Sequence, residues 1–245
     1  MPAIILPYLF YLILRTLMSP ERFARITNML NHRQPELTVL LEDVHKSHNL
    51  AAIVRTADAV GVNDVHATRE TKTTKVCGVT ATGSQNWVKI HTHENIEDAI
   101  AALRAQGMQI IATNLSDTAI DFREVDYTKP TAILMGQEKT GISAQALALA
   151  DQDVIIPMLG MCQSLNVSVA SALILYEAQR QRENAGMYGE CRLSDAEKHR
   201  ILFEGGHPIF TKLCKQKKIP YPALDSEGQI DAPDLWWQEI RQTKK

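Results

Sequence analysis

Short apolar segments alternate with helical patterns along most of the chain, and this alternation most strongly limits its fold. Segments with the length and composition of strands lie at 37–41, 65–68, 87–91, 109–114, 131–136 and 153–157. Helical apolar periodicity predicts helices at 49–60, 96–106, 144–150 and 165–181. Strands that alternate with helices form mostly parallel sheets with helices on both faces. We therefore expect an α/β fold.

Both ends of the chain differ from this central region. Ser19 is a favoured helix N-cap, Pro20 suits the first helical position, and an amphipathic pattern follows them. Residues 185–245 combine short helical patterns with four lysines between positions 212 and 218. We predict a central domain at 35–184, with helical extensions at 18–34 and 185–245.

The first seventeen residues form a separate apolar segment. Its uncharged run, 3–14, is shorter than the roughly 20 residues that a membrane span needs, and Pro7 interrupts it. No basic region precedes the run and no small-residue cleavage site follows it, so a signal peptide is a poor interpretation. We expect residues 1–17 to be a leader upstream of a native start at Met18; the alternative is a peripheral membrane anchor.

Charge and cysteine content limit the possible partners. The 26 basic and 28 acidic residues give a formal net charge of -2, so a nucleic-acid site would need local basic patches. The four cysteines are far apart and form no C-x-x-C pair. This pattern argues against a disulfide framework or a zinc site, and favours a reducing, cytoplasmic location. We expect no metal.

Common catalytic signatures are absent from the sequence. The segment GQEKTG, 136–141, lacks the Lys-Ser/Thr pair of a phosphate-binding P-loop. No G-x-G-x-x-G follows a predicted strand, and no G-x-S-x-G is present. Dinucleotide oxidoreductase and serine hydrolase functions are therefore disfavoured.

Three polar clusters lie at predicted strand ends, where parallel sheets bind ligands. Asn49 and Arg55 form the first, Glu138 the second, and Ser164 with Asn166 the third. Each cluster alone has a simpler explanation, because such residues also cap helices or lie on charged surfaces. Their shared position favours one common site.

These clusters resemble the three motifs of the SpoU/TrmH branch of the SPOUT RNA methyltransferases. The first motif is N-x5-R, at Asn49 and Arg55; the other two are MGQEKTGIS and IPMLGMCQSLNVSVASALILYEA. The segments HRQPELTV and DFREVDYTKPTAILMGQEKTG strengthen the resemblance, which extends from Met18 to about Trp237. Within the branch, the chain is most similar to the enzymes that methylate guanosine 18 in the D-loop of tRNA.

The resemblance implies a deep trefoil knot in the C-terminal part of the sheet domain. It also implies S-adenosylmethionine as the cofactor, a tRNA substrate, and a homodimer whose active site lies near the subunit interface. The residues expected to contact the cofactor are Thr113, Gly136, Ile156 and Leu165.

The implied reaction is methyl transfer to a ribose 2′-hydroxyl. The family assigns the essential role to the arginine of the first motif, here Arg55. Asn49, Glu138, Ser164 and Asn166 would position this arginine, the ribose or the cofactor. The residues expected to contact RNA are Arg25, His48, Arg180 and Arg182.

Two alternative functions remain open. One is 2′-O-methylation of ribosomal RNA, although relatives of that kind usually have an additional N-terminal RNA-binding domain. The other is an RNA-binding module of the same fold without catalysis, which the intact motif residues disfavour.

Overall fold

The computed structural model describes residues 18–68, 83–137 and 139–241. The chain divides into two compact units. Arg33–Glu190 form the sheet unit, and Met1–His32 together with Cys191–Lys245 form the terminal unit. Residues 1–17 lie outside the described residues, so the expectation of a leader stays a prediction.

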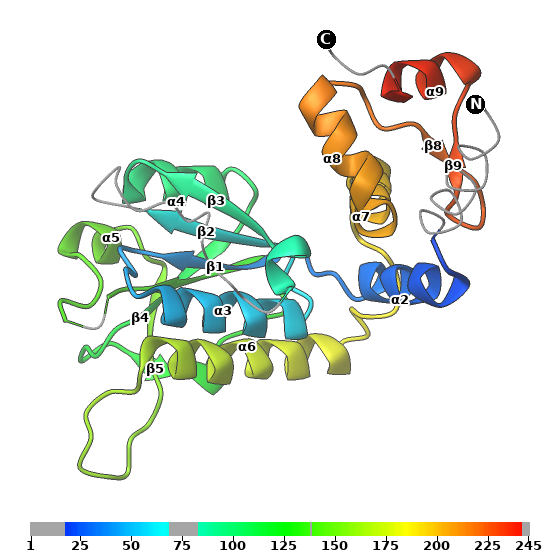
Figure 1. Ribbon diagram of the computed structural model, residues 1–245. Coiled ribbons are helices and arrows are strands. Elements are labelled where there is room, and N and C mark those ends of the chain that lie inside the picture. The colour runs from blue at the N-terminus through cyan, green and yellow to red at the C-terminus, as the bar shows by residue number, and fades with distance from the viewer. Residues whose placement is uncertain (1–17, 69–82, 138, 242–245) are drawn as a thin grey trace. The chain divides into compact units, whose positions relative to one another are not determined.

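The sheet unit contains a seven-stranded sheet in the order β3-β2-β1-β6-β4-β7-β5, in which every pair is parallel (Figure 1). Its strands are β1 (Leu37–Leu41), β2 (Asp64–Thr68), β3 (Lys89–His93), β4 (Gln109–Thr113), β5 (Ile120–Asp121), β6 (Thr131–Met135) and β7 (Gln152–Ile155). The α/β prediction and all six predicted strands are confirmed, with strand ends that differ by at most two residues. The short strand β5 was not predicted.

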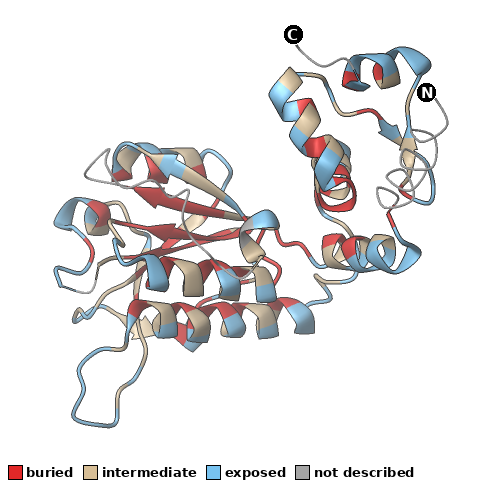
Figure 2. Cartoon of the chain, in the orientation of Figure 1, coloured by how far each residue is buried: buried red, intermediate tan, exposed pale blue. Residues whose placement is uncertain are grey.

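Helices cover both faces of this sheet. Helices α3 (Ser47–Ala59) and α6 (Val167–Asn184) lie side by side on one face, where they pack on Leu37, Val39 and Leu41 (Figure 1). Helices α4 (Ile96–Arg104) and α5 (Ala144–Ala148) pack on the other face, against Leu40 and Leu134. The strands between these layers are the most deeply buried part of the unit (Figure 2). Burial on both faces explains why the strands are apolar without alternation.

The two predicted extensions fold together as the terminal unit. Its helices are α2 (Pro20–Asn31), α7 (Asp195–Gly206), α8 (Pro208–Lys217) and α9 (Asp234–Arg241). The unit also contains an antiparallel hairpin, β8 (Ala223–Leu224) and β9 (Ile230–Asp231), which was not predicted.

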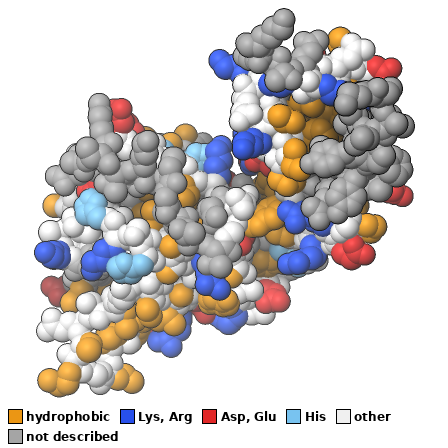
Figure 3. All heavy atoms as spheres, viewed as in Figure 1, with side chains coloured by type: hydrophobic (Ala, Val, Ile, Leu, Met, Phe, Trp, Pro, Cys, Tyr) orange, Lys and Arg blue, Asp and Glu red, His pale blue; other side chains and the backbone are white. Residues whose placement is uncertain are grey.

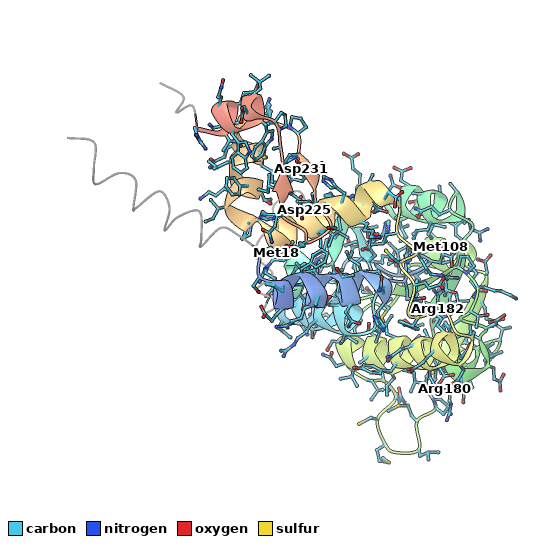
Figure 4. All side chains as sticks on the ribbon, turned by 90° about the vertical axis from the view of Figure 1, so that its right-hand side faces the viewer. Met18, Met108, Arg180, Arg182, Asp225 and Asp231 are labelled. Carbon is cyan, nitrogen blue, oxygen red and sulfur yellow. The ribbon has the colours of Figure 1, made fainter. Side chains whose placement is uncertain are left out.

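Contacts within the terminal unit hold the first turn of α2 and the residue before it. Ser19 caps α2 as predicted, because its hydroxyl accepts a hydrogen bond from the N–H of Arg22. Met18 is buried beside the hairpin, and its carbonyl accepts a hydrogen bond of 2.8 Å from the Gln229 side chain (Figure 4). Among the described residues, no helix has the length and apolarity needed to span a membrane.

A histidine cluster occupies the β2–β3 edge of the sheet. His66 is buried, its ring stacks on those of His91 and His93, and its Nδ1 lies 2.9 Å from His93 Nε2. His91 Nε2 lies 2.6 Å from the Asp64 carboxylate. Burial, reinforced by the neighbouring histidines, lowers the pKa of His66 from 6.5 to about 4. Within the described part of the chain, no group of three or more His, Cys, Asp or Glu side chains could hold a metal ion.

The low pKa of His66 predicts acid sensitivity. Between pH 6.5 and about 4, His66 takes up a proton in the unfolded chain but not in the folded one. The free energy of unfolding should therefore fall as the pH falls, by about 2 kcal/mol between pH 7 and pH 5. Urea unfolding at pH 7 and pH 5 should show a smaller loss in His66→Gln than in the wild type. The exposed His45 provides a control, since His45→Gln should keep the wild-type loss. An equal loss in all three proteins would contradict this assignment.

Candidate functional site

Three of the predicted cofactor residues lie at the carboxyl edge of the sheet. Thr113 is the last residue of β4, Gly136 directly follows β6, and Ile156 directly follows β7. Strands β6, β4 and β7 are neighbours in the sheet and parallel, so their carboxyl ends lie together. The structure therefore brings these residues to one edge, whereas their contact with a cofactor stays a prediction.

The loop after β6 is tightly folded. We refer to residues 136–143 as the β6 loop. The N–H of Gly141 donates a hydrogen bond of 2.9 Å to the carbonyl of Gln137. Gly136 packs so closely on the backbone of Gly141 and Ile142 that a Cβ atom would overlap them, which explains the glycine. Glu138 belongs to this loop but lies outside the described residues, so the structure does not place it.

Two predicted catalytic residues, Asn49 and Asn166, lie in contact. Asn49 is buried in the first turn of α3, and Asn166 is the N-cap of α6. The Asn166 side chain accepts a hydrogen bond of 2.8 Å from the N–H of Ser168. Its Nδ2 donates a hydrogen bond of 3.2 Å to Asn49 Oδ1. This bond joins the start of α3, which contains the first motif, to the start of α6, which contains the end of the third motif.

Arg55 lies on the same helix as Asn49 but points elsewhere. Arg55 lies six positions after Asn49, which is not a whole number of helical turns, and Asn49 is buried whereas Arg55 is exposed on α3. Within the described residues, the guanidinium of Arg55 has no ion-pair partner. An exposed guanidinium with free donors can bind a phosphate or orient a hydroxyl group.

The loop between β7 and α6 is exposed. Ser164 is exposed and Leu165 is half-buried, while Leu159 and Met161 are fully exposed. The loop projects beyond the strands in Figure 1, and hydrophobic side chains cover its end in Figure 3. The structure does not show the expected trefoil knot, which stays a prediction, as do the roles of Ser164 and Leu165.

Three of the residues predicted to contact RNA are exposed. Arg25 lies on α2 in the terminal unit, and His48 lies in the first turn of α3. Arg180 lies on α6, where its guanidinium donates two hydrogen bonds, of 2.9 and 2.6 Å, to the Glu177 carboxylate. These bonds lower the pKa of Glu177. Because an exposed ion pair contributes little stability, a phosphate could replace Glu177 as the partner of Arg180.

The fourth residue, Arg182, is completely buried. Its guanidinium donates hydrogen bonds to four oxygen atoms, the carbonyls of Tyr127, Glu36 and Lys129 and the side chain of Gln34. Arg180 and Arg182 leave α6 on opposite sides (Figure 4). This burial contradicts the expected contact between Arg182 and RNA. Arg182 instead connects α6 to the segments that precede β1 and β6.

Sequence reasoning also missed Glu42, the residue directly after β1. Glu42 is only 7% exposed, and its carboxylate accepts two hydrogen bonds from Ser143 at the end of the β6 loop. The available signal was a charged residue immediately after the apolar strand LTVLL.

We expect Arg182→Ala to lower the free energy of unfolding by about 3 kcal/mol or more, since it removes a fully buried guanidinium that donates to four oxygen atoms. Arg180→Ala, two residues away on the exposed side, is the matched control and should change it by at most about 1 kcal/mol. Urea unfolding monitored by circular dichroism measures both. Equal stability of the two variants would show that the buried hydrogen bonds contribute nothing.

The sequence also matches known RNA methylase families and proteins. Residues 36–176 match the SpoU rRNA Methylase family, and residues 180–233 match the C-terminal part of SpoU rRNA methylases. The chain is 61% identical over 226 residues to the tRNA (guanosine(18)-2′-O)-methyltransferase of Escherichia coli K12, covering 91% of this chain and 99% of that protein.

Two solved structures are similar as well. One is the A. aeolicus TrmH/SpoU tRNA modifying enzyme, with a TM-score of 0.70, 44% identity, and coverage of 77% of this chain and 96% of that one. The other is an AdoMet-bound rRNA methyltransferase from Sinorhizobium meliloti, with a TM-score of 0.54, 36% identity, and coverage of 62% and 59%. The motifs, the fold and these matches together show that the chain belongs to the SpoU methylase family.

Proposed function

We propose that this protein transfers a methyl group from S-adenosylmethionine to the 2′-hydroxyl of guanosine 18 in tRNA. The observation that supports it most strongly is the 61% identity to the E. coli tRNA (guanosine(18)-2′-O)-methyltransferase over 99% of that protein. Identity of this extent covers the sheet unit and both extensions. A tRNA substrate also favours a cytoplasmic location.

The carboxyl edge of the sheet fits the cofactor. The ends of β4, β6 and β7 lie side by side there, and the glycine at 136 lets the β6 loop fold back tightly on the end of β6. Such strand ends are the usual ligand sites of parallel sheets. Thr113, Gly136, Ile156 and Leu165 would hold S-adenosylmethionine, which supplies an electrophilic methyl group on a positively charged sulfur.

Arg55 of the first motif would act on the RNA, and Asn49, Glu138, Ser164 and Asn166 would position Arg55, the ribose or the cofactor. The planar guanidinium of Arg55 binds an RNA phosphate and orients the 2′-hydroxyl toward the methyl group. Arg55 remains protonated and stabilises the negative charge that develops on the ribose oxygen, whereas phosphate or water accepts the hydroxyl proton. The Asn49–Asn166 hydrogen bond holds the start of this helix in place.

A homodimer would cover the exposed apolar face of α6. Val169, Leu173 and Tyr176 lie one or two turns apart on this helix and are 47%, 42% and 54% exposed. Leu159 and Met161 in the preceding loop add further exposed apolar surface. Apolar surface of this extent commonly marks a protein interface. A second copy of the chain would bury it close to the predicted catalytic residues.

Methylation of ribosomal RNA is the second candidate function. The matching family is described as rRNA methylases, and the Sinorhizobium meliloti rRNA methyltransferase is 36% identical to this chain. The higher identity to the tRNA enzyme favours tRNA.

Mass spectrometry of tRNA and rRNA digests from a strain that lacks the gene tests the proposal. We expect loss of 2′-O-methylguanosine from position 18 of tRNA, with rRNA unchanged. Loss from rRNA alone would support the second candidate, and an unchanged pattern in both RNAs would contradict catalysis.

Lysine should not replace Arg55, because an ammonium group lacks the two-pronged geometry that binds phosphate and hydroxyl together. We expect Arg55→Lys to lose at least about 100-fold in single-turnover methylation of a tRNA transcript, about as much as Arg55→Ala. Calorimetric titration should show that both variants bind S-adenosylmethionine normally. If Arg55→Lys turns over nearly as fast as the wild type, only the positive charge at position 55 is needed, and the proposed role of the guanidinium geometry is wrong.

A charge in the middle of the apolar face should prevent dimerisation. We expect Leu173→Glu to sediment as a monomer and to lose activity, since an unpaired carboxylate is costly to bury at an interface. Ile209→Glu is the control, because Ile209 is also about half exposed but lies on α8 of the terminal unit. Sedimentation of Leu173→Glu as a dimer, or of the wild type as a monomer, would contradict this interface.

A further inference from the structure

We infer that Glu42 is a positioning residue for the cofactor site, and that it acts through Ser143 on the β6 loop. The inference rests on the proposed function, which it deepens. Glu42 lies outside the three motifs.

Glu42 stands where two loops of the site begin. Its N–H donates a hydrogen bond of 2.9 Å to the carbonyl of Met135, which extends the pairing of β1 and β6 by one residue. The chain then continues on one side toward α3, with Asn49 and Arg55, and on the other side into the β6 loop. Movement of Glu42 therefore affects both loops.

The carboxylate of Glu42 binds the last residue of the β6 loop, Ser143. Its Oε2 accepts a hydrogen bond of 2.8 Å from the N–H of Ser143, and its Oε1 accepts one of 2.6 Å from the Ser143 hydroxyl. The same hydroxyl accepts a bond of 3.1 Å from the N–H of Ala146 and so caps α5. Both carboxylate oxygens are thus engaged by one residue, 101 positions away in the sequence.

The backbone on both sides of this contact is constrained. Asp43, directly after Glu42, has a left-handed φ of 51°, which costs free energy in a residue other than glycine. Gly136, at the start of the β6 loop, has no space for a Cβ atom. A left-handed conformation such as that of Asp43 persists only where surrounding contacts fix it, and the Glu42–Ser143 contact joins the two loops.

Stability alone does not require a carboxylate at position 42. Glu42 is 7% exposed and lies on the same face as Leu40, so an apolar side chain could fill its place. Replacing both partners of such a contact by apolar groups of the same shape can be nearly neutral or stabilising. The carboxylate instead specifies the geometry of the β6 loop, which contains Gly136. A misplacement of about 1 Å is enough to impair a binding or catalytic site.

Asp151 offers a matched control at the opposite edge of the sheet. Its carboxylate accepts one hydrogen bond from the N–H of Ile110 and one from the Arg104 guanidinium, each of 2.7 Å. Asp151, like Glu42, therefore connects distant segments through a backbone N–H and a side chain. It lies before β7, at the amino edge, away from the predicted cofactor residues.

The test compares Glu42→Gln, Ser143→Ala, the double variant and Asp151→Asn in the full chain. For each protein, calorimetry measures the S-adenosylmethionine Kd, steady-state methylation measures KM for cofactor and for tRNA, and thermal melting measures stability. We expect Glu42→Gln and Ser143→Ala each to bind S-adenosylmethionine about tenfold more weakly, the loss typical of one charge-assisted hydrogen bond. KM for tRNA should stay within about twofold, and the double variant should lose no more than the stronger single variant.

The outcomes separate three cases. Asp151→Asn should keep the wild-type cofactor Kd whether or not its melting temperature falls, which distinguishes positioning at the cofactor site from general stability. A normal cofactor Kd in Glu42→Gln, even with a lowered melting temperature, would overturn the inference, as would fully additive losses in the double variant. If Glu42→Gln does not fold, Ser143→Ala decides, since Ser143 is exposed and a normal Kd in that variant is equally contrary. Failure of the wild type to bind S-adenosylmethionine would instead reject the proposed function, and the inference with it.

Discussion

The buried guanidinium of Arg182 fixes helix α6, and the arrangement of the site depends on that helix. Arg182 ties the end of α6 to the segments before β1 and β6, at the amino edge of the sheet. Because a helix is rigid and advances about 1.5 Å per residue, its anchored end determines where its first turn lies. Asn166 caps that first turn and meets Asn49. A hydrogen-bond cluster at one edge thus sets the contact between two motifs at the other.

At the carboxyl edge, two buried polar side chains, Asn49 and Glu42, control the backbone geometry through bonds to exposed residues. The Asn49–Asn166 bond joins the starts of α3 and α6, and the Glu42–Ser143 bonds join the loops after β1 and β6. Arg55 is exposed beside this framework and keeps its donors available for a substrate. The positioning side chains and the reacting side chain are therefore different residues. This arrangement is chemically reasonable, since a site holds its geometry best when supporting contacts position the groups that react.

The sequence predicts the sheet well, because parallel strands buried on both faces are continuous apolar runs such as 131–135. It also places Thr113, Gly136 and Ile156 at strand ends. Predictions that depend on three-dimensional packing are weaker. Arg182 resembles an ordinary surface cation near a helix end, and only the fold shows the carbonyls around it. His66 and His93, far apart in sequence, meet through the parallel register of β2 and β3. The role of Glu42 cannot be seen in the sequence either, because its partner, Ser143, lies 101 residues away.

Methylation of one ribose hydroxyl is tested most directly with two tRNA transcripts that differ only at position 18. One contains guanosine there and the other 2′-deoxyguanosine, which lacks the accepting oxygen. With radiolabelled S-adenosylmethionine, we expect one methyl group per molecule in the guanosine transcript and background incorporation in the deoxy transcript. Equal incorporation into both would place the methyl group elsewhere and contradict the proposed reaction.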